Sequence, residues 1–293
     1  MGGRGENRGN PAGVKLGTEP DFELLRPKIR TRAPSRLFWE ETTMRILFMM
    51  PAAKGVYSPE AAERRINLVN SYATSSLQID VDYLPEPSGF LPWGGQDVSN
   101  HRSLENMRRT HELGARRAAQ AEQEGYDAFC PFGGIDAGVK LAREQGVKIP
   151  MSGPGEASAL LCALIGRPFA SCSYLATNGN SEGDRDRYRD LYRDLGIGHL
   201  HVASTAIGLA NTEYPQRRDE VLERFKRCAR EAREAGAGLM GFLMQSICPT
   251  EFSARELFEA TGLPCVDGIA AQISMVEMWH RTGLPQSLVK IPR

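Results

Sequence analysis

From Met44 onward, short apolar segments alternate with longer segments of helical periodicity, and this alternation constrains the fold more than any other feature. The segments 45–50, 77–84 and 127–132 are typical of buried or half-buried strands. Helical patterns of about 10–20 residues separate them, as in βαβ units. Strands joined in this way favour parallel sheets with right-handed crossovers. The sequence therefore predicts an α/β fold.

The same pattern then restarts in the second half of the chain. Further strands are predicted at 168–174, 199–204 and 238–244. In each half a buried strand ends near a cysteine and is followed by a turn of small residues and a helix. Short proline-containing strands are then predicted at 148–152 ("KIPMS") and 263–268 ("LPCVDG"). We predict two similar lobes with a cleft between them.

Composition excludes several classes of function. The 36 basic and 36 acidic residues cancel, so no field of one sign attracts nucleic acid or an anionic membrane. The longest apolar runs, at 46–50 and 239–244, are far shorter than the ~20 residues of a membrane-spanning helix. Six cysteines are dispersed without a C-x-x-C pair, which is typical of reduced thiols. We expect a cytoplasmic protein that acts on a small molecule.

The first 43 residues differ from the rest of the chain. "MGGRGENRGNPAG" is rich in Gly, Arg and Asn, and the segment lacks both apolar periodicity and the apolar region of a secretory signal. We predict a disordered N-terminal extension over 1–43. Lobe 1 is then expected over 44–155 and lobe 2 over 156–268, and a C-terminal helix in 269–293 is expected to complete lobe 1.

Three motifs have both a chemical and a structural interpretation. "SGPGEAS" (152–158) resembles a dinucleotide-binding turn but lacks its third glycine, so we expect a tight turn whose free N–H groups can hold an anion. "HLH" (199–201) places two imidazoles on one face of a strand without an evident third metal ligand. The charges of "DRDRYRDLYRD" (184–194) are typical of a solvated helix face. We predict no metal and no cofactor.

One of the six cysteines stands apart. Cys248 closely follows the strand predicted at 238–244 and precedes a helix that is predicted to begin near Phe252 or Ser253. A thiol at a helix N-terminus has a lowered pKa, so Cys248 is a candidate functional group. Four others lie in apolar or helical stretches and are expected in the core: Cys162, Cys172, Cys228 and Cys265.

Several motifs together resemble the aspartate/glutamate/hydantoin racemase superfamily, over roughly residues 44–281. They are "MRILFMMP", "GYDAFCPFGGIDAGVKLARE", "IPMSGPGEAS", "GRPFASCSY" and "CPTEFSARELFEATGLPCVDGIAAQ". The resemblance implies two pseudo-symmetric flavodoxin-like lobes with parallel sheets and an active-site cleft between them. It also implies a cofactor-independent racemase or epimerase that acts at the carbon α to a carboxylate or hydantoin carbonyl.

The superfamily's enzymes use two cysteines, one from each lobe, as acid and base. Cys248 lies nineteen residues before Asp267, close to the superfamily spacing of its second cysteine. The position of the first cysteine is Gly133 in this chain. Cys130 lies three residues upstream, roughly 10 Å away along a strand, and could serve only if the strand ended early.

The resemblance also implies the residues that would contact a substrate. They are Gly133, Gly134, Ser152, Gly153 and Gly155, with hydroxyl groups from Ser173 and Thr250. The expected substrate is a small carboxylate, an amino acid or a hydantoin-like molecule, and a homo-oligomer is compatible with the sequence. Two alternatives stay open. A lone second-lobe cysteine facing a glycine resembles the arylmalonate decarboxylases, with the maleate isomerases as further neighbours, and a degenerate member would bind a small carboxylate without turnover.

Overall fold

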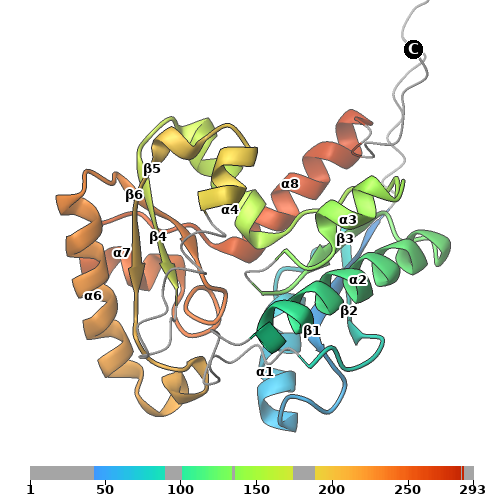
Figure 1. Ribbon diagram of the computed structural model, residues 1–293, viewed down its shortest axis with the longest axis horizontal. Coiled ribbons are helices and arrows are strands. Elements are labelled where there is room, and N and C mark those ends of the chain that lie inside the picture. The colour runs from blue at the N-terminus through green and yellow to red at the C-terminus, as the bar shows by residue number, and fades with distance from the viewer. Residues whose placement is uncertain (1–42, 90–100, 134–135, 174–188, 285, 287–293) are drawn as a thin grey trace, which may run out of the picture. The chain divides into compact units, whose positions relative to one another are not determined.

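A computed structural model describes residues 43–89, 101–133, 136–173, 189–284 and 286. The predicted extension over 1–43 lies outside the described residues, apart from Thr43. The first half contains β1 (Met44–Ala53), β2 (Leu77–Leu84) and β3 (Ala128–Pro131). These strands form a parallel sheet in the order β2-β1-β3 (Figure 1).

The second half contains β4 (Phe169–Ser173), β5 (His201–Ala206) and β6 (Leu239–Leu243), which form a parallel sheet in the order β5-β4-β6. In each sheet the first strand of the set lies in the centre, the second on one side and the third on the other. This is the order in which a flavodoxin-like sheet begins. The α/β class and its parallel sheets are therefore confirmed.

Helices flank both sheets, and several begin at residues that cap them. Ser58 accepts a hydrogen bond from the N–H of Ala61 at the start of α1, and Ser253 and Glu256 form a capping box at the start of α7. No helix in the described ranges combines the length and the apolar character needed to cross a bilayer. The α-helices are α1 (Pro59–Asn70), α2 (His101–Gln123), α3 (Val139–Glu144), α4 (Pro154–Ile165), α6 (Arg218–Glu234), α7 (Ala254–Thr261) and α8 (Gly268–Thr282), with 3-10 helices η2 (Gly198–Leu200) and η3 (Asn211–Gln216).

Helix α8 contributes to the cores of both sheets. Its residues Ile269 and Ile273 pack in the core cluster that contains β1 and β3, whereas Ala271 and Met275 pack in the cluster that contains β4 and β6. The alternation of the two sets around the helix places one apolar face against each half of the chain. The lobe boundaries proposed from the sequence stay a prediction.

A chain of buried amide groups also joins the two halves. Gln245 follows β6 and Gln272 lies on α8, and both side chains are almost fully buried. Gln245 accepts a hydrogen bond from the N–H of Gly133 and donates one to Gln272 Oε1 at 2.7 Å. Gln272 Nε2 donates at 2.8 Å to the carbonyl oxygens of Pro131 and Ser152. Four separate segments are therefore fixed by two side chains.

Two predicted strands are wrong. The segments 148–152 and 263–268 each make only a single bridge to the neighbouring strand. Pro150 and Pro264 contribute their carbonyl oxygens, which accept from the backbone N–H groups of β3 and β6, but have no N–H of their own. A proline removes a ladder hydrogen bond, so the pairing stops at one bridge.

The amide chain can be tested by Gln272→Leu. The substitution leaves two buried carbonyl groups and the Gln245 amide without their partner, and we expect a loss of about 2–4 kcal/mol in the free energy of unfolding. Urea denaturation measures the change, with Gln120→Leu on the exposed side of α2 as the matched control. Equal stability of the two variants would show that the amide chain does not hold the halves together.

Candidate active site

The candidate site lies where the two sheets end. In a sheet of this order ligands bind outside the carboxyl ends of the strands, beside the central strand. Gly133 follows β3 and the segment 244–250 follows β6, each next to the central strand of its sheet. The N–H of Gly133 donates to Gln245 Oε1, so the two turns are in direct contact. The structure thus brings together the turns that the sequence proposed as the two sides of the site.

Cys248 is buried in the turn after β6, and its backbone N–H donates to Met244 O at 3.1 Å. Helix α7 begins only at Ala254 and is capped by Ser253, so the thiol does not lie at a helix N-terminus. Burial, followed by the charge of Asp267, raises the pKa of Cys248 well above its ordinary value. The expected lowering of this pKa is therefore wrong. In this structure Cys248 carries its proton at neutral pH.

Two hydroxyl groups flank Cys248 in the same turn. The side-chain oxygens of Ser246 and Thr250 are buried and have no hydrogen-bond partner among the described residues. A buried hydroxyl without a partner is costly, which favours contact with a bound ligand. Ser173 ends the neighbouring strand β4, and the N–H of Met244 donates to the carbonyl oxygen of Cys172 beside it. Thr250 and Ser173 were proposed from the sequence, whereas Ser246 was missed.

Asp267 links this turn to the start of α8. Its Oδ1 accepts from the backbone N–H groups of Ile269 and Ala270, at 2.9 and 3.1 Å. Its Oδ2 accepts a hydrogen bond of 2.5 Å from the hydroxyl of Tyr72. Burial and the Asp267 charge together raise the pKa of Tyr72, so that Tyr72 holds its proton as a donor. These hydrogen bonds fix the Asp267 carboxylate, whose charge helps to raise the pKa of the Cys248 thiol.

Glu251 fixes the chain just after Cys248. Its side chain is only 4% exposed and pairs with Arg64 of α1 at 2.7 Å and with Arg218 of α6 at 4.0 Å. The Arg218 guanidinium also lies over the ring of Phe252, 4.3 Å from its centroid. A buried carboxylate with charged partners on two helices holds its position firmly. The cysteine turn is therefore anchored to both halves of the chain.

The turn at Gly133 has a backbone shape that suits glycine. Its φ of +96° lies in the region that other residues rarely adopt, and an added Cβ would lie 3.3 Å from Pro51 Cγ. Cys130 is fully buried in β3, where it packs in the same core cluster as Phe48, and burial raises the pKa of its thiol. Both thiols are buried in core clusters, but Cys248 lies in the turn after β6, whereas Cys130 lies within strand β3. Gly134 lies outside the described residues.

The N-terminus of α4 was expected to hold a substrate anion, but the side-chain carboxyl group of Asp136 already occupies it. Asp136 accepts hydrogen bonds of 2.8 Å from the N–H groups of Gly155 and Glu156 at the start of α4. A Cβ added at Gly153 would lie 2.1 Å from Asp136 Cγ, so the glycines of "SGPGEAS" admit this carboxylate. The Ser152 carbonyl is engaged by an amide of the chain described above. The N–H of Gly155 is therefore not available to a substrate.

Burial and the Glu156 charge raise the pKa of Asp136 to about 7, although its two backbone hydrogen bonds oppose the shift. Glu156 itself pairs with both terminal nitrogens of Arg143, at 2.7 and 2.9 Å. The sequence analysis did not predict that Asp136 caps the start of α4. The available signal was an acidic residue that follows a buried strand and precedes the Gly-x-Gly turn of 153–155.

The two histidines of "HLH" do not share a strand face. His199 lies in η2 and His201 begins β5. His201 Nε2 lies 3.0 Å from Ser171 Oγ, and burial lowers the pKa of the imidazole to about 4. Within the described part of the chain, no three His, Cys, Asp or Glu side chains gather as metal ligands would. His201 is therefore a structural residue.

Comparison with known proteins gives structural matches only. No family model and no curated protein matches the chain. The allantoin racemase from Klebsiella pneumoniae matches with a TM-score of 0.63 at 20% identity, over 83% of this chain and 90% of that chain. The allantoin racemase from Pseudomonas fluorescens matches with a TM-score of 0.62 at 19% identity, over 85% and 98%.

A liganded double mutant of arylmalonate decarboxylase matches with a TM-score of 0.54 at 12% identity, over 83% of this chain and 94% of that chain. The chain shares the fold of these two allantoin racemases and of this arylmalonate decarboxylase. At these identities the likeness concerns the fold alone.

Asp136 predicts a pH dependence of stability. Its folded-state pKa of about 7 lies above the ordinary 3.8, so the native state binds the proton more tightly than the unfolded chain does. Its contribution to stability is complete below pH 3.8 and is lost as the pH rises through 7, with a slope of at most about 1.4 kcal/mol per pH unit. Urea denaturation between pH 4 and 8 should show that Asp136→Asn removes this slope. The exposed Asp190→Asn should retain it, and equal slopes in both variants would contradict the assignment.

Asp267→Asn should lower the pKa of Cys248. The amide keeps an oxygen to cap α8 but removes the negative charge that opposes thiolate formation. The alkylation rate of Cys248, followed by peptide mass spectrometry against pH, should rise at a lower pH than in the unchanged protein. Tyr72→Phe keeps the Asp267 charge and is the matched control. A shift in both variants, or in neither, would contradict the role of the charge.

Proposed function

We propose that the chain is a cofactor-independent enzyme that transfers a proton at the carbon α to a carboxylate or hydantoin carbonyl, with Cys248 as the acid/base group. One observation carries the proposal: Cys248 lies between two hydroxyl groups without partners, in a turn that contacts the Gly133 turn of the other sheet. Proton transfer to carbon needs an acid of suitable pKa and donors for the developing oxyanion. The turn after β6 offers a protonated thiol and two hydroxyl donors.

The state of Cys248 favours a proton-donating role. Its raised pKa keeps the thiol protonated in the unliganded site. The S–H bond breaks as its proton goes to the α-carbon of an enolate-like intermediate, and the thiolate takes a proton from water after the product leaves. The hydroxyl groups of Ser246 and Thr250 would donate to the enolate oxygen while its charge is developed.

Racemisation is the first candidate for the overall reaction. The two allantoin racemases match at TM-scores of 0.62 and 0.63, above the 0.54 of the arylmalonate decarboxylase mutant. The sequence motifs also resemble the hydantoin racemase-like members most closely. A racemase must remove a proton from one face of the α-carbon and return one on the other. Cys248 would return the proton, and a second group on the opposite face would have to remove one.

Decarboxylation or isomerisation with a single thiol is the second candidate. It is favoured by the glycine at position 133 and by the place of Cys130 within strand β3, which leave one thiol at the facing turns. The matching arylmalonate decarboxylase mutant has a glycine changed to cysteine and a cysteine changed to serine. The unchanged enzyme therefore contains one glycine and one cysteine at these positions, the same two residue types as Gly133 and Cys248 here. Loss of carbon dioxide generates the enediolate without a base, and the thiol only needs to protonate it.

Cys248→Ala and Cys130→Ala test the proposal together. Each variant is incubated in deuterium oxide with amino acids, 5-substituted hydantoins and arylmalonates, and deuterium at the α-carbon is measured by mass spectrometry. We expect Cys248→Ala to lose roughly 100- to 10,000-fold in rate, because the acid/base group is removed. Cys130→Ala should keep the rate, because that thiol lies in the core.

The products distinguish the candidates. Deuterium exchange with loss of optical activity identifies a racemase, whereas incorporation only with release of carbon dioxide identifies a decarboxylase. Full activity of Cys248→Ala would refute the role of this thiol. If the unchanged protein binds these compounds and incorporates no deuterium, the chain is a carboxylate-binding protein without turnover.

A further inference from the structure

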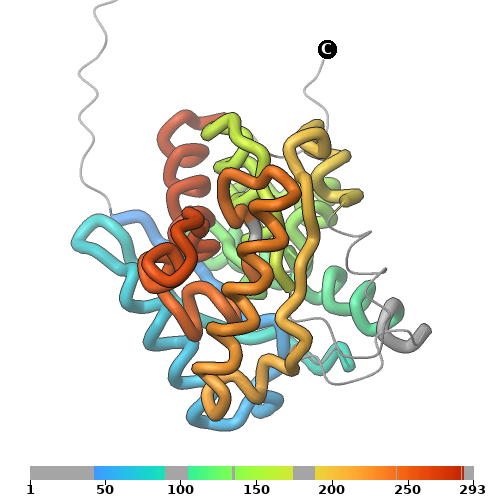
Figure 2. The backbone as a smooth tube through the Cα atoms, turned by 90° about the vertical axis from the view of Figure 1, so that its left-hand side faces the viewer, coloured from blue at the N-terminus to red at the C-terminus, as the bar shows by residue number. Residues whose placement is uncertain are grey.

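A cavity of about 560 Å³ lies between α1 and η3. One wall is formed by residues 56–65, which follow β1, and the other by residues 211–216, which follow β5. The two segments, in light blue and light orange, both lie at the bottom of the view in Figure 1 and in Figure 2. A cavity of this volume can hold a small molecule, and segments that follow strand ends are where α/β proteins bind ligands.

Arg65 brings an unneutralised positive charge to this cavity. Its Nη1 donates to the Ala61 carbonyl at 2.8 Å, and its guanidinium lies 4.7 Å from the centroid of the Tyr57 ring. No carboxylate pairs with Arg65 in the described ranges. Glu251, which also acts on Arg65 electrostatically, is paired with the neighbouring Arg64 at 2.7 Å. Burial lowers the pKa of Arg65, which indicates that water solvates this cation incompletely.

One acidic side chain also lines the cavity. Glu60 lies in the first turn of α1 and is exposed, and the helix N-terminus lowers its pKa through backbone hydrogen bonding and the Ser58 hydroxyl. A charge in contact with water is screened, whereas the half-buried charge of Arg65 is screened less. The less screened of the two charges at the cavity is therefore positive.

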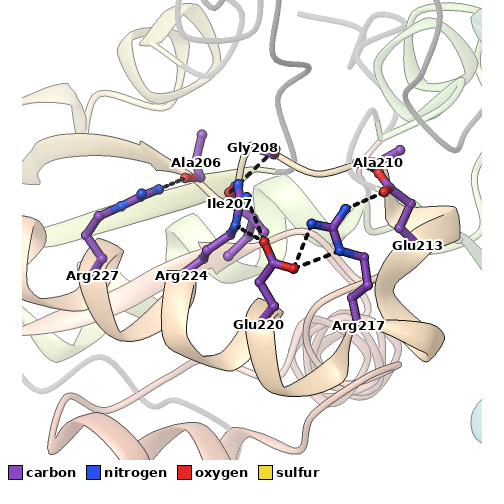
Figure 3. A network of polar contacts seen from close by, with 9 residues as sticks. All are labelled: Ala206, Ile207, Gly208, Ala210, Glu213, Arg217, Glu220, Arg224 and Arg227. Carbon is purple, nitrogen blue, oxygen red and sulfur yellow. Dashed lines mark hydrogen bonds and ion pairs between the residues drawn. The ribbon is translucent and has the colours of Figure 1, made fainter.

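The opposite wall is held in place by an ion-pair network at the start of α6 (Figure 3). Arg224 donates to the carbonyl oxygens of Ile207 and Gly208, both at 3.1 Å, and pairs with Glu220. Glu213 accepts from the N–H of Ala210, and Arg217 bridges the two glutamates. The segment from β5 to η3 is thus fixed before any ligand arrives, and a preformed wall reduces the entropic cost of binding.

The remaining lining is partly apolar and partly polar. Val56, Ala61 and Pro215 provide apolar surface, and Thr212 and Gln216 provide a hydroxyl and an amide. We propose that this cavity binds a small organic carboxylate with an apolar body, and that the carboxylate pairs with Arg65. A guanidinium matches a carboxylate with two parallel hydrogen bonds, so Arg65 is well suited to this pairing. The inference does not rest on proton transfer by Cys248.

Phenylacetate is the probe, and phenylacetamide is its uncharged counterpart. Binding is measured by titration calorimetry on the full chain. We expect phenylacetate to bind more tightly than phenylacetamide, and Arg65→Gln to weaken phenylacetate binding by roughly 10- to 100-fold, as loss of a charge-assisted pair implies. Affinity for phenylacetamide should hold in this variant. Arg109→Gln, at an exposed ion pair on α2, is the matched control and should change neither affinity.

Two further variants keep the test decisive if Arg65→Gln lowers stability. Arg65→Lys keeps the charge and should keep part of the preference for phenylacetate. Thr212→Trp fills the cavity from an exposed position and should abolish binding of both probes. Cys248→Ala should bind phenylacetate as the unchanged protein does. Equal affinity for the two probes, no binding of either, full binding by Thr212→Trp, or loss of binding in Cys248→Ala would each overturn the inference.

Discussion

The structure around the candidate site depends on the two buried amides of Gln245 and Gln272. Gln272 uses both of its N–H groups on carbonyl oxygens in the first half and its oxygen on Gln245. Gln245 uses its own oxygen on the N–H of Gly133. Removal of one amide would leave several buried groups unpaired at once, which makes such a chain strongly cooperative. The relative position of the turns after β3 and β6 follows from this chain.

The protein's own carboxylates occupy the helix starts near the site. Asp136 takes the N–H groups at the start of α4, and Asp267 takes those at the start of α8. In many α/β proteins such positions hold a ligand anion. The proposed substrate oxygen would therefore be stabilised by other groups, and Ser246 and Thr250 carry buried hydroxyl groups without partners in the described chain. In the proposed reaction, the turn that carries the thiol would also stabilise the oxyanion.

The sequence was sufficient for the fold because strands and helices are local patterns. The strand predicted at 77–84 is the observed β2, whereas the strands predicted at 148–152 and 263–268 fail because a proline limits their pairing. The site was predicted only in part. The place of Cys248 after a strand could be read from the sequence, but its pKa depends on burial and on Asp267, which only the folded chain brings close. Gln272 was missed because a single polar residue in an apolar helix does not reveal its partners.

The single thiol of the site is a property of the backbone as well as of the side chain. At Gly133 the φ of +96° suits glycine, and a cysteine there would be strained and would place its Cβ 3.3 Å from Pro51 Cγ. A second acid/base thiol would therefore require a different turn. Cys130 does not supply it, because the strand that carries Cys130 pairs with β1 through Phe48 and buries the thiol in the core. The turn at Gly133 and the strand at Cys130 thus leave Cys248 as the thiol on which the proposed chemistry depends.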